Sequence, residues 1–145
     1  MRRVDVPVIA NASVGVLDAG VVLTRLDKRR RHHAEVCVLF GQAGKGATAL
    51  YISAVNLAEV VEHSAAYTRA TGLDPVALLD SFQIEVHPPD VQVARAVARL
   101  ADLADLSLAD RFAAATAQVL RARLHTTDPT LADAARKRRV PVSRY

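Results

Sequence analysis

Four acidic residues occupy positions where a fold could bring their side chains together. Asp110 follows the polar residue Ser107 at the third position of a predicted helix, ahead of the alanine-rich run 113–117. Because small residues allow a helix to pack closely, an acid in its first turn is held in one place. Asp18, Glu59 and Asp128 lie at comparable junctions between an apolar run and a helical one. These four acids are the candidate reactive residues.

Helix capping explains each acid separately. Asp18 and Asp128 suit a helix N-cap, and Asn56 with Glu59 has the spacing of a capping box. Capping does not require the acids to converge. Two carboxylates about 5 Å apart repel by roughly 3 kcal/mol at an effective dielectric of 20, and a helix N-terminus offsets only ~0.3–1 kcal/mol. A converged cluster therefore calls for protons or a cation.

The oxygen ligands indicate which cation a converged cluster would hold. Carboxylates without a cysteine ligand favour Mg²⁺, with Mn²⁺ as a substitute, over Zn²⁺. Such an ion lowers the pKa of bound water and neutralises phosphate oxygens, which is the chemistry of phosphodiester hydrolysis. We therefore expect Asp18, Glu59, Asp110 and Asp128 to be both metal ligands and catalytic residues.

Apolar runs alternate with helical patterns along the chain. Strands are predicted at 14–17, 49–52, 83–87 and 124–126, with a short edge strand at 140–142. Helices are predicted at 19–26, 76–82, 91–104, 107–123 and 131–139; one further helix ends at about residue 41, and another begins at residue 53. This order predicts a parallel sheet covered by helices on both faces. Sites in such folds lie beyond the carboxyl ends of the strands, where Asp18 and Asp128 fall.

Composition limits the classes of protein. A chain of 145 residues with 51% hydrophobic content fits one folded domain, which we assign to residues 14–145 after a loosely ordered extension at 1–13. Cys37 is the only cysteine, which excludes an internal disulfide and favours the cytoplasm. No apolar run approaches the ~20 residues of a membrane span.

Positive charge points to a polyanionic or acidic partner. The net charge is +4, and basic residues cluster at Lys28–Arg31 and again at Arg136–Arg139. Each cluster is either a solvated face or a contact for RNA phosphates. The glycine-rich segment 41–48 lacks the spacing of a phosphate-binding P-loop and leads into a strand. We interpret it as a connector.

Four segments in order resemble the successive motifs of a PIN domain. They are Val16–Gly20, Ile52–Val60, Leu106–Asp110 with Ala113–Ala117, and Leu124–Asp128. The resemblance extends from residue 14 to about 142, and the length is similar to that of VapC-type toxins of bacterial toxin–antitoxin pairs. A haloacid-dehalogenase-like phosphatase would need a second acid at position 20, which is Gly20. A phosphate-receiver domain would need paired early acids and a late lysine.

The resemblance implies a fold, an activity and partners. The expected fold is α/β, a PIN-like three-layer sandwich whose central parallel sheet of four to five strands has helices on both faces. The expected activity is that of an Mg²⁺-dependent endoribonuclease toxin that forms a homodimer and is inhibited by a cognate antitoxin. A non-catalytic PIN-like module that binds RNA or protein is the alternative.

The resemblance also assigns roles to residues. Asp18 and Asp110 would be the main metal ligands, and Glu59 and Asp128 would complete the site directly or through water. Thr126 would hold a carboxylate or a phosphate oxygen of the substrate. Thr130 stands where the family often has a second acid.

Overall fold

The computed structural model describes residues 13–103 and 105–145, and five strands of this part form one sheet. The strand order is β3-β2-β1-β4-β5, and each neighbouring pair is parallel. The strands are β1 (Ser13–Leu17), β2 (Thr48–Ser53), β3 (Glu85–His87), β4 (Arg123–Thr126) and β5 (Val142–Arg144). The predicted parallel sheet is thus confirmed, and β1 lies at its centre.

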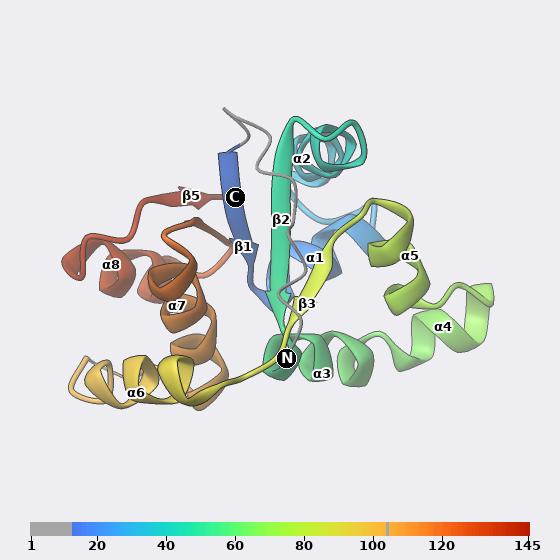
Figure 1. The fold of residues 1–145 in the computed structure, drawn as a ribbon. Coiled ribbons are helices and arrows are strands. Elements are labelled where there is room, and N and C mark those ends of the chain that lie inside the picture. Colours follow the sequence, from blue (N-terminus) through green and yellow to red (C-terminus); the bar gives the residue numbers. More distant parts are fainter. Residues whose placement is uncertain (1–12, 104) are drawn as a thin grey trace, which may run out of the picture.

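Helices cover both faces of the sheet, as Figure 1 shows. One layer holds α1 (Ala19–Leu26), α2 (His33–Gly44), α3 (Ala54–His63), α4 (Ala65–Thr71) and α5 (Pro75–Ser81). The other holds α6 (Val91–Arg99), α7 (Leu108–Leu120) and α8 (Pro129–Lys137). The predicted three-layer sandwich is therefore confirmed. Among the described residues, no helix is both long enough and apolar enough to span a membrane.

Successive residues of β1 pack into the two hydrophobic cores on opposite faces of the sheet. Val16 packs with residues of α6, α7 and α8, whereas Leu17 packs with residues of α1, α2 and α3. Both side chains are fully buried, which explains why this strand is an unbroken apolar run. The alanines of α7 pack in the first of these cores, so the start of α7 is held close to the sheet.

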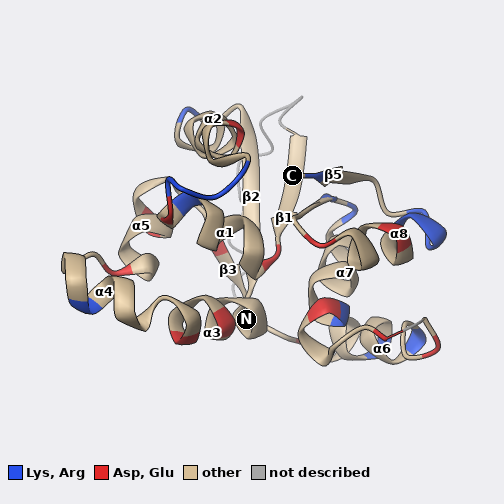
Figure 2. Cartoon of the chain, turned by 180° about the vertical axis from the view of Figure 1, so that it is seen from behind, with Lys and Arg blue, Asp and Glu red and all other residues tan. Residues whose placement is uncertain are grey.

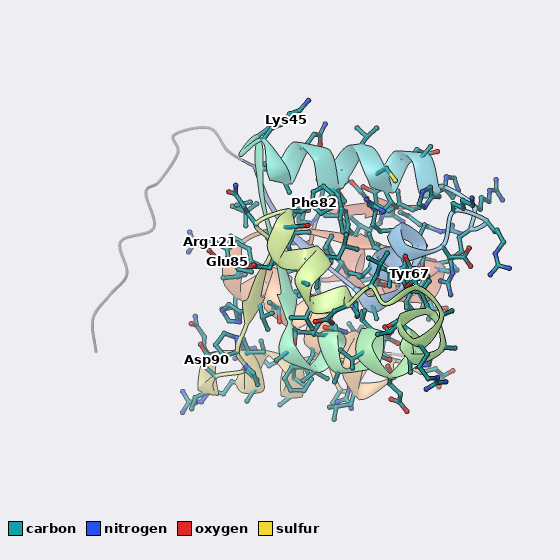
Figure 3. The ribbon with its side chains drawn as sticks, turned by 90° about the vertical axis from the view of Figure 1, so that its right-hand side faces the viewer. Lys45, Tyr67, Phe82, Glu85, Asp90 and Arg121 are labelled. Carbon is teal, nitrogen blue, oxygen red and sulfur yellow. The ribbon has the colours of Figure 1, made fainter. Side chains whose placement is uncertain are left out.

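Aromatic side chains close the second core. Phe40 of α2 meets Phe82, the residue after α5, edge to face with ring centroids 5.5 Å apart. The Arg25 guanidinium lies 5.3 Å from the Phe82 ring centroid. Figure 3 shows Phe82 between α2 and α5. This contact holds the end of α5 against α2, and so helps to position the short strand β3, which follows α5 in the chain.

Several predicted boundaries were wrong. Helix α7 ends at Leu120 rather than near 123, because Arg121 adopts the left-handed conformation with φ of 51°. Helix α6 ends at Arg99 rather than 104, and the helix predicted from 53 is divided at Ser64 into α3 and α4. The last strand spans 142–144 rather than 140–142. Of the predicted extension 1–13, residues 1–12 lie outside the described residues, and Ser13 begins β1.

Gly15 offers a test of the packing around the central strand. A Cβ added there would lie 2.7 Å from Leu50 Cδ2 and 2.8 Å from His125 Nε2. We expect Gly15→Ala to lower the free energy of unfolding by about 1–3 kcal/mol through overpacking. The matched control is Gly41→Ala in α2, where nothing lies within 4 Å, and where alanine should add about 1 kcal/mol of stability. Urea unfolding measures both, and equal shifts would contradict this packing.

Candidate metal-binding active site

The connections leaving β1 and β4 diverge to opposite faces of the sheet. β1 leads into α1, which packs in one core, and β4 leads into α8, which packs in the other. In parallel sheets this divergence opens a crevice beyond the carboxyl ends of the two strands. Asp18 follows β1 directly, and Asp128 comes two residues after the end of β4. The Asp18 N–H donates to the carbonyl oxygen of His125 at 3.0 Å and so joins the two strand ends.

Asp18 is buried at the carboxyl end of β1, with 6% of its surface exposed. As the N-cap of α1, its Oδ1 accepts a hydrogen bond from the Val21 N–H at 3.1 Å. Its Oδ2 accepts from the Thr126 hydroxyl. The Thr126 hydroxyl oxygen in turn accepts from the Asp128 N–H at 3.0 Å. Thr126 therefore contacts one of the predicted ligands and orients the backbone of another.

Asp110 and Asp128 each use one carboxylate oxygen as a cap. Asp110 Oδ2 accepts from the Ser107 N–H at 3.2 Å and closes a capping box at the start of α7. Asp128 Oδ1 accepts from the Thr130 N–H at 2.8 Å at the start of α8. Among the described residues, neither Asp110 Oδ1 nor Asp128 Oδ2 accepts a hydrogen bond. Capping thus leaves an oxygen free on each acid.

Asp110 and Asp128 lie close enough for their charges to act on Asp18. The pKa of Asp18 is raised from 3.8 to about 6, mainly by burial, against the opposing effect of the hydrogen bonds from Thr126 and Val21. The charges of Asp110 and Asp128 are smaller causes of the same rise. No ion pair found within residues 13–103 and 105–145 includes any of these three acids. Figure 2 marks the acidic positions at the end of β1 and at the starts of α7 and α8 in red.

Glu59 lies in the middle of α3. The predicted Asn56–Glu59 capping box was wrong, because Ser53 is the N-cap of α3 and accepts from the Val55 N–H at 3.2 Å. The Asn56 amide instead donates to the carbonyl oxygen of Ala109 at 3.0 Å. This bond ties α3 to the first turn of α7, next to Asp110. Glu59, one turn after Asn56, is not among the charges that shift the pKa of Asp18.

The donor set fits a hard divalent cation. In the part of the chain that the structure describes, no group of three or more carboxylate, histidine or cysteine side chains is placed to hold a metal ion. Mg²⁺ does not require one, because it usually keeps several waters and binds through one or two carboxylates. The free oxygens of Asp110 and Asp128 beside the uncompensated charge of Asp18 meet this requirement. Their role as ligands, and that of Glu59, stays a prediction.

His125 and Tyr145 support the end of β4, and the sequence alone did not reveal either role. The His125 Nδ1 lies 2.9 Å from the Tyr145 hydroxyl, and the Tyr145 N–H donates to the carbonyl oxygen of Thr126 at 3.0 Å. Burial lowers the pKa of His125 to about 4, so this ring is neutral at neutral pH. A neutral, fixed imidazole holds Thr126 in place without adding charge to the acids.

A basic groove adjoins the acid-bearing helices. It has a volume of about 800 Å³ and lies between the turn after α1 and the helices α3 and α4. Lys28, Arg30, His63 and Tyr67 are among its lining residues. His63 is one turn beyond Glu59 at the end of α3, and none of the four acids is among the lining residues.

The pKa values of Asp18 and His125 are shifted in opposite directions, so both affect how stability depends on pH. Because the folded pKa of Asp18 is raised to about 6, its charged form opposes folding. The free-energy cost of the charged Asp18 is absent below the unfolded pKa of about 4, and it grows as the pH rises towards and through 6. A shift of about two units corresponds to roughly 3 kcal/mol.

We therefore expect Asp18→Asn to raise the melting temperature by several degrees at pH 7.5 in chelator, and to leave it nearly unchanged at pH 4. The protonation of His125 at low pH affects wild type and variant alike, so the difference between them isolates Asp18. Thermal unfolding from pH 4 to 8 measures this. A difference that does not vary with pH would contradict a buried, uncompensated carboxylate.

Comparison with solved structures shows where this fold recurs. The chain is similar to VapBC2 from Rickettsia felis bound to a DNA fragment from its promoter, with a TM-score of 0.69, 15% identity, and coverage of 90% of this chain and 98% of that one. It is similar to FitAcB from Neisseria gonorrhoeae, with a TM-score of 0.65, 22% identity, and coverage of 88% and 95%.

A third similar structure is the Mycobacterium tuberculosis toxin VapC20, described as cleaving the sarcin–ricin loop. The TM-score is 0.63 and the identity 12%, with coverage of 83% of this chain and 94% of that one. At these identities the likeness establishes the fold. A search of the curated proteins returned no match. The sequence profile of the PIN domain matches residues 15–137, which include most of β1, the strands β2 to β4 and all four acids, and the chain therefore belongs to the PIN-domain family.

Proposed function

We propose that this chain is the endoribonuclease toxin of a toxin–antitoxin pair and hydrolyses RNA phosphodiester bonds at the acidic cluster. The observation that carries the proposal is the buried carboxylate of Asp18, which two further carboxylates approach without a basic partner among the described residues. Such a cluster is costly unless a cation and a phosphate use it. Membership of the PIN-domain family and the likeness to VapC20 support RNA as the substrate.

The residues would divide the work as follows. Asp18 and Asp110 would hold Mg²⁺, for which Mn²⁺ could substitute, and Glu59 and Asp128 would complete the site directly or through water. When bound, the ion would activate a water molecule and neutralise phosphate charge. Thr126 keeps the Asp18 carboxylate oriented through its hydroxyl. The N-termini of α1, α7 and α8 lie at this edge, and their positive dipole ends favour an anionic substrate.

The partners follow from the same proposal. The basic groove lined by Lys28, Arg30, His63 and Tyr67 would guide the RNA to the acids, since arginine and lysine contact phosphates and an aromatic ring stacks on bases. The similar VapBC and FitAcB structures are named as complexes, which supports a cognate antitoxin for this chain. We expect a homodimer that acts in the cytoplasm.

A binding module without catalysis is the second candidate. It is favoured because no group of three or more ligand-type side chains among the described residues is placed to hold a metal ion. In this reading the same surface would hold RNA or a protein partner, and the acids would act only as helix caps. The two candidates differ in whether purified protein cuts RNA when metal is supplied.

Cleavage of a mixed RNA pool is the direct test. We expect wild-type protein to cut RNA with Mg²⁺ and not with chelator. Asp110→Asn should reduce the rate by on the order of 100-fold or more, because it removes a ligand oxygen while asparagine still caps α7. The matched control is Asp133→Asn on α8, an exposed acid that pairs only with Arg136 among the described residues. This control should cut at the wild-type rate.

Each alternative outcome has one meaning. Cleavage by wild type and Asp110→Asn alike would identify a contaminating nuclease. RNA binding without cleavage by wild-type protein, free of antitoxin, would favour the binding module.

Metal binding can be measured without any cleavage. Mg²⁺ at about 100 times its dissociation constant should stabilise wild type by about 2.7 kcal/mol, which corresponds to a rise of several degrees in melting temperature. Asp110→Asn should lose most of this rise, and Asp133→Asn should keep it. An equal rise in all three proteins would rule out a cation site at the acidic cluster.

A further inference from the structure

A second cavity lies at the other end of α7 from the acidic cluster. Its volume is about 570 Å³, and four arginines line it: Arg99 from α6, Arg121 from the end of α7, and Arg138 and Arg139 from the turn after α8. We call it the arginine cavity. Arg138 pairs with Asp102 at 2.8 Å. The other three arginines have no acidic partner among residues 13–103 and 105–145.

Two of these arginines have an unusual backbone. Arg121 and Arg139 have φ of 51° and 60°, a left-handed conformation that few residues other than glycine adopt. Arginine at a helix C-terminus is favoured by the helix dipole, and this accounts for the charge at each helix end. The helix dipole does not explain why arginine, rather than glycine, occupies two strained positions that line one cavity. Such strain often accompanies a binding role.

The chemistry of the lining favours phosphate. All four basic residues are arginines, whose planar guanidinium groups bind phosphate oxygens through two parallel hydrogen bonds. An interface for a protein partner usually has an aromatic or large apolar centre. Here the apolar lining includes small side chains such as Ala96, Ala117 and Ala122. The cavity therefore suits a chain of phosphates better than an acidic protein surface.

We propose that the arginine cavity binds the phosphodiester backbone of the RNA substrate away from the bond that is cut. This inference rests on the proposed ribonuclease function. Asp110 and Arg121 lie in the first turn and at the C-cap of α7, roughly 16 Å apart along the helix axis at 1.5 Å per residue. That distance corresponds to about five stacked nucleotides. Only longer RNA would reach both the acids and the cavity.

The basic clusters therefore differ in place and in role. Figure 2 shows the basic turn after α8 in blue on the side of the molecule away from the turn between α1 and α2. The groove lies between the turn after α1 and the helices α3 and α4, whereas the arginine cavity lies at the amino end of β4, beside Ala122. The fold places Arg99 and Arg121 beside the basic cluster Arg136–Arg139, which is distant from them in the sequence.

Glycine substitutions test the cavity without disturbing the backbone. The double variant Arg121→Gly/Arg139→Gly removes two charges. Glycine readily adopts the positive φ found at both positions. The control Lys45→Gln/Arg95→Gln removes two charges from exposed residues that do not line the cavity. RNA binding is measured in chelator by fluorescence anisotropy over a range of salt concentrations, with single strands of 5 and 20 nucleotides. A second variant, Arg121→Gln/Arg139→Gln, guards against any effect of glycine on folding.

We expect both arginine variants to lower the salt slope for the 20-mer by about 1.4, from two lost phosphate contacts at about 0.7 each. The affinity at 0.1 M salt should fall on the order of tenfold. The 5-mer, which the cavity can bind without the acids, should also bind less tightly to the arginine variants, and the control should keep the wild-type slope. With Mg²⁺, the KM for long RNA should rise while kcat stays unchanged.

Three results would overturn the inference. A wild-type slope in both arginine variants, while wild-type protein still cuts RNA, would exclude the cavity and leave the proposed function standing. A loss of binding to polyglutamate without a loss of RNA binding would assign the cavity to an acidic protein. A wild-type protein that neither binds nor cuts RNA would overturn the proposed function and the cavity together.

Discussion

The structure depends on a carboxylate buried where two parallel strands end. The Asp18 N–H bonds to the end of β4, and its side chain accepts from the first turn of α1 and from the Thr126 hydroxyl. One residue thus joins the central strand, its neighbour and the following helix. Burial makes the charged form of Asp18 unfavourable, so the contacts that fix the acid in place do not fully offset the cost of keeping it there. A domain that retains such a cost at neutral pH is expected to use the charge.

Helix capping and the proposed chemistry use the same residues. Asp18 and Asp128 cap α1 and α8, and Asp110 closes the capping box of α7. Capping fixes the rotamer of each acid and leaves one oxygen of Asp110 and of Asp128 free. The three helix N-termini also supply a positive field at this edge, which lessens the mutual repulsion of the acids and favours a phosphate. The capping explanation is therefore correct for these three acids, though not for Glu59, and it also explains how they are held in place.

Opposite charges occupy the two ends of α7. Asp110 lies in its first turn and Arg121 caps its last, and both positions suit the helix dipole. The alanines between them pack in the core against the sheet, so this helix is a rigid spacer between the acidic cluster and the arginine cavity. A polyanion bound at the arginine end would be held at a fixed distance from the acids. The same charge order that stabilises the helix thus gives each end a different affinity for phosphate.

The sequence by itself determined the parallel α/β class, the order of strands and helices, the N-caps at Asp18, Ser107 and Asp128, and the likeness to the PIN family. These features follow from local patterns of apolar and capping residues. Tertiary structure decided that Ser53 caps α3 while Asn56 binds the carbonyl of Ala109, because both residue types can cap and only packing distinguishes them. It ended α7 at Arg121 without a glycine signal. It also brought Asp110 and Asp128 to Asp18, because the place of β1 between β2 and β4 depends on contacts between residues far apart in the chain.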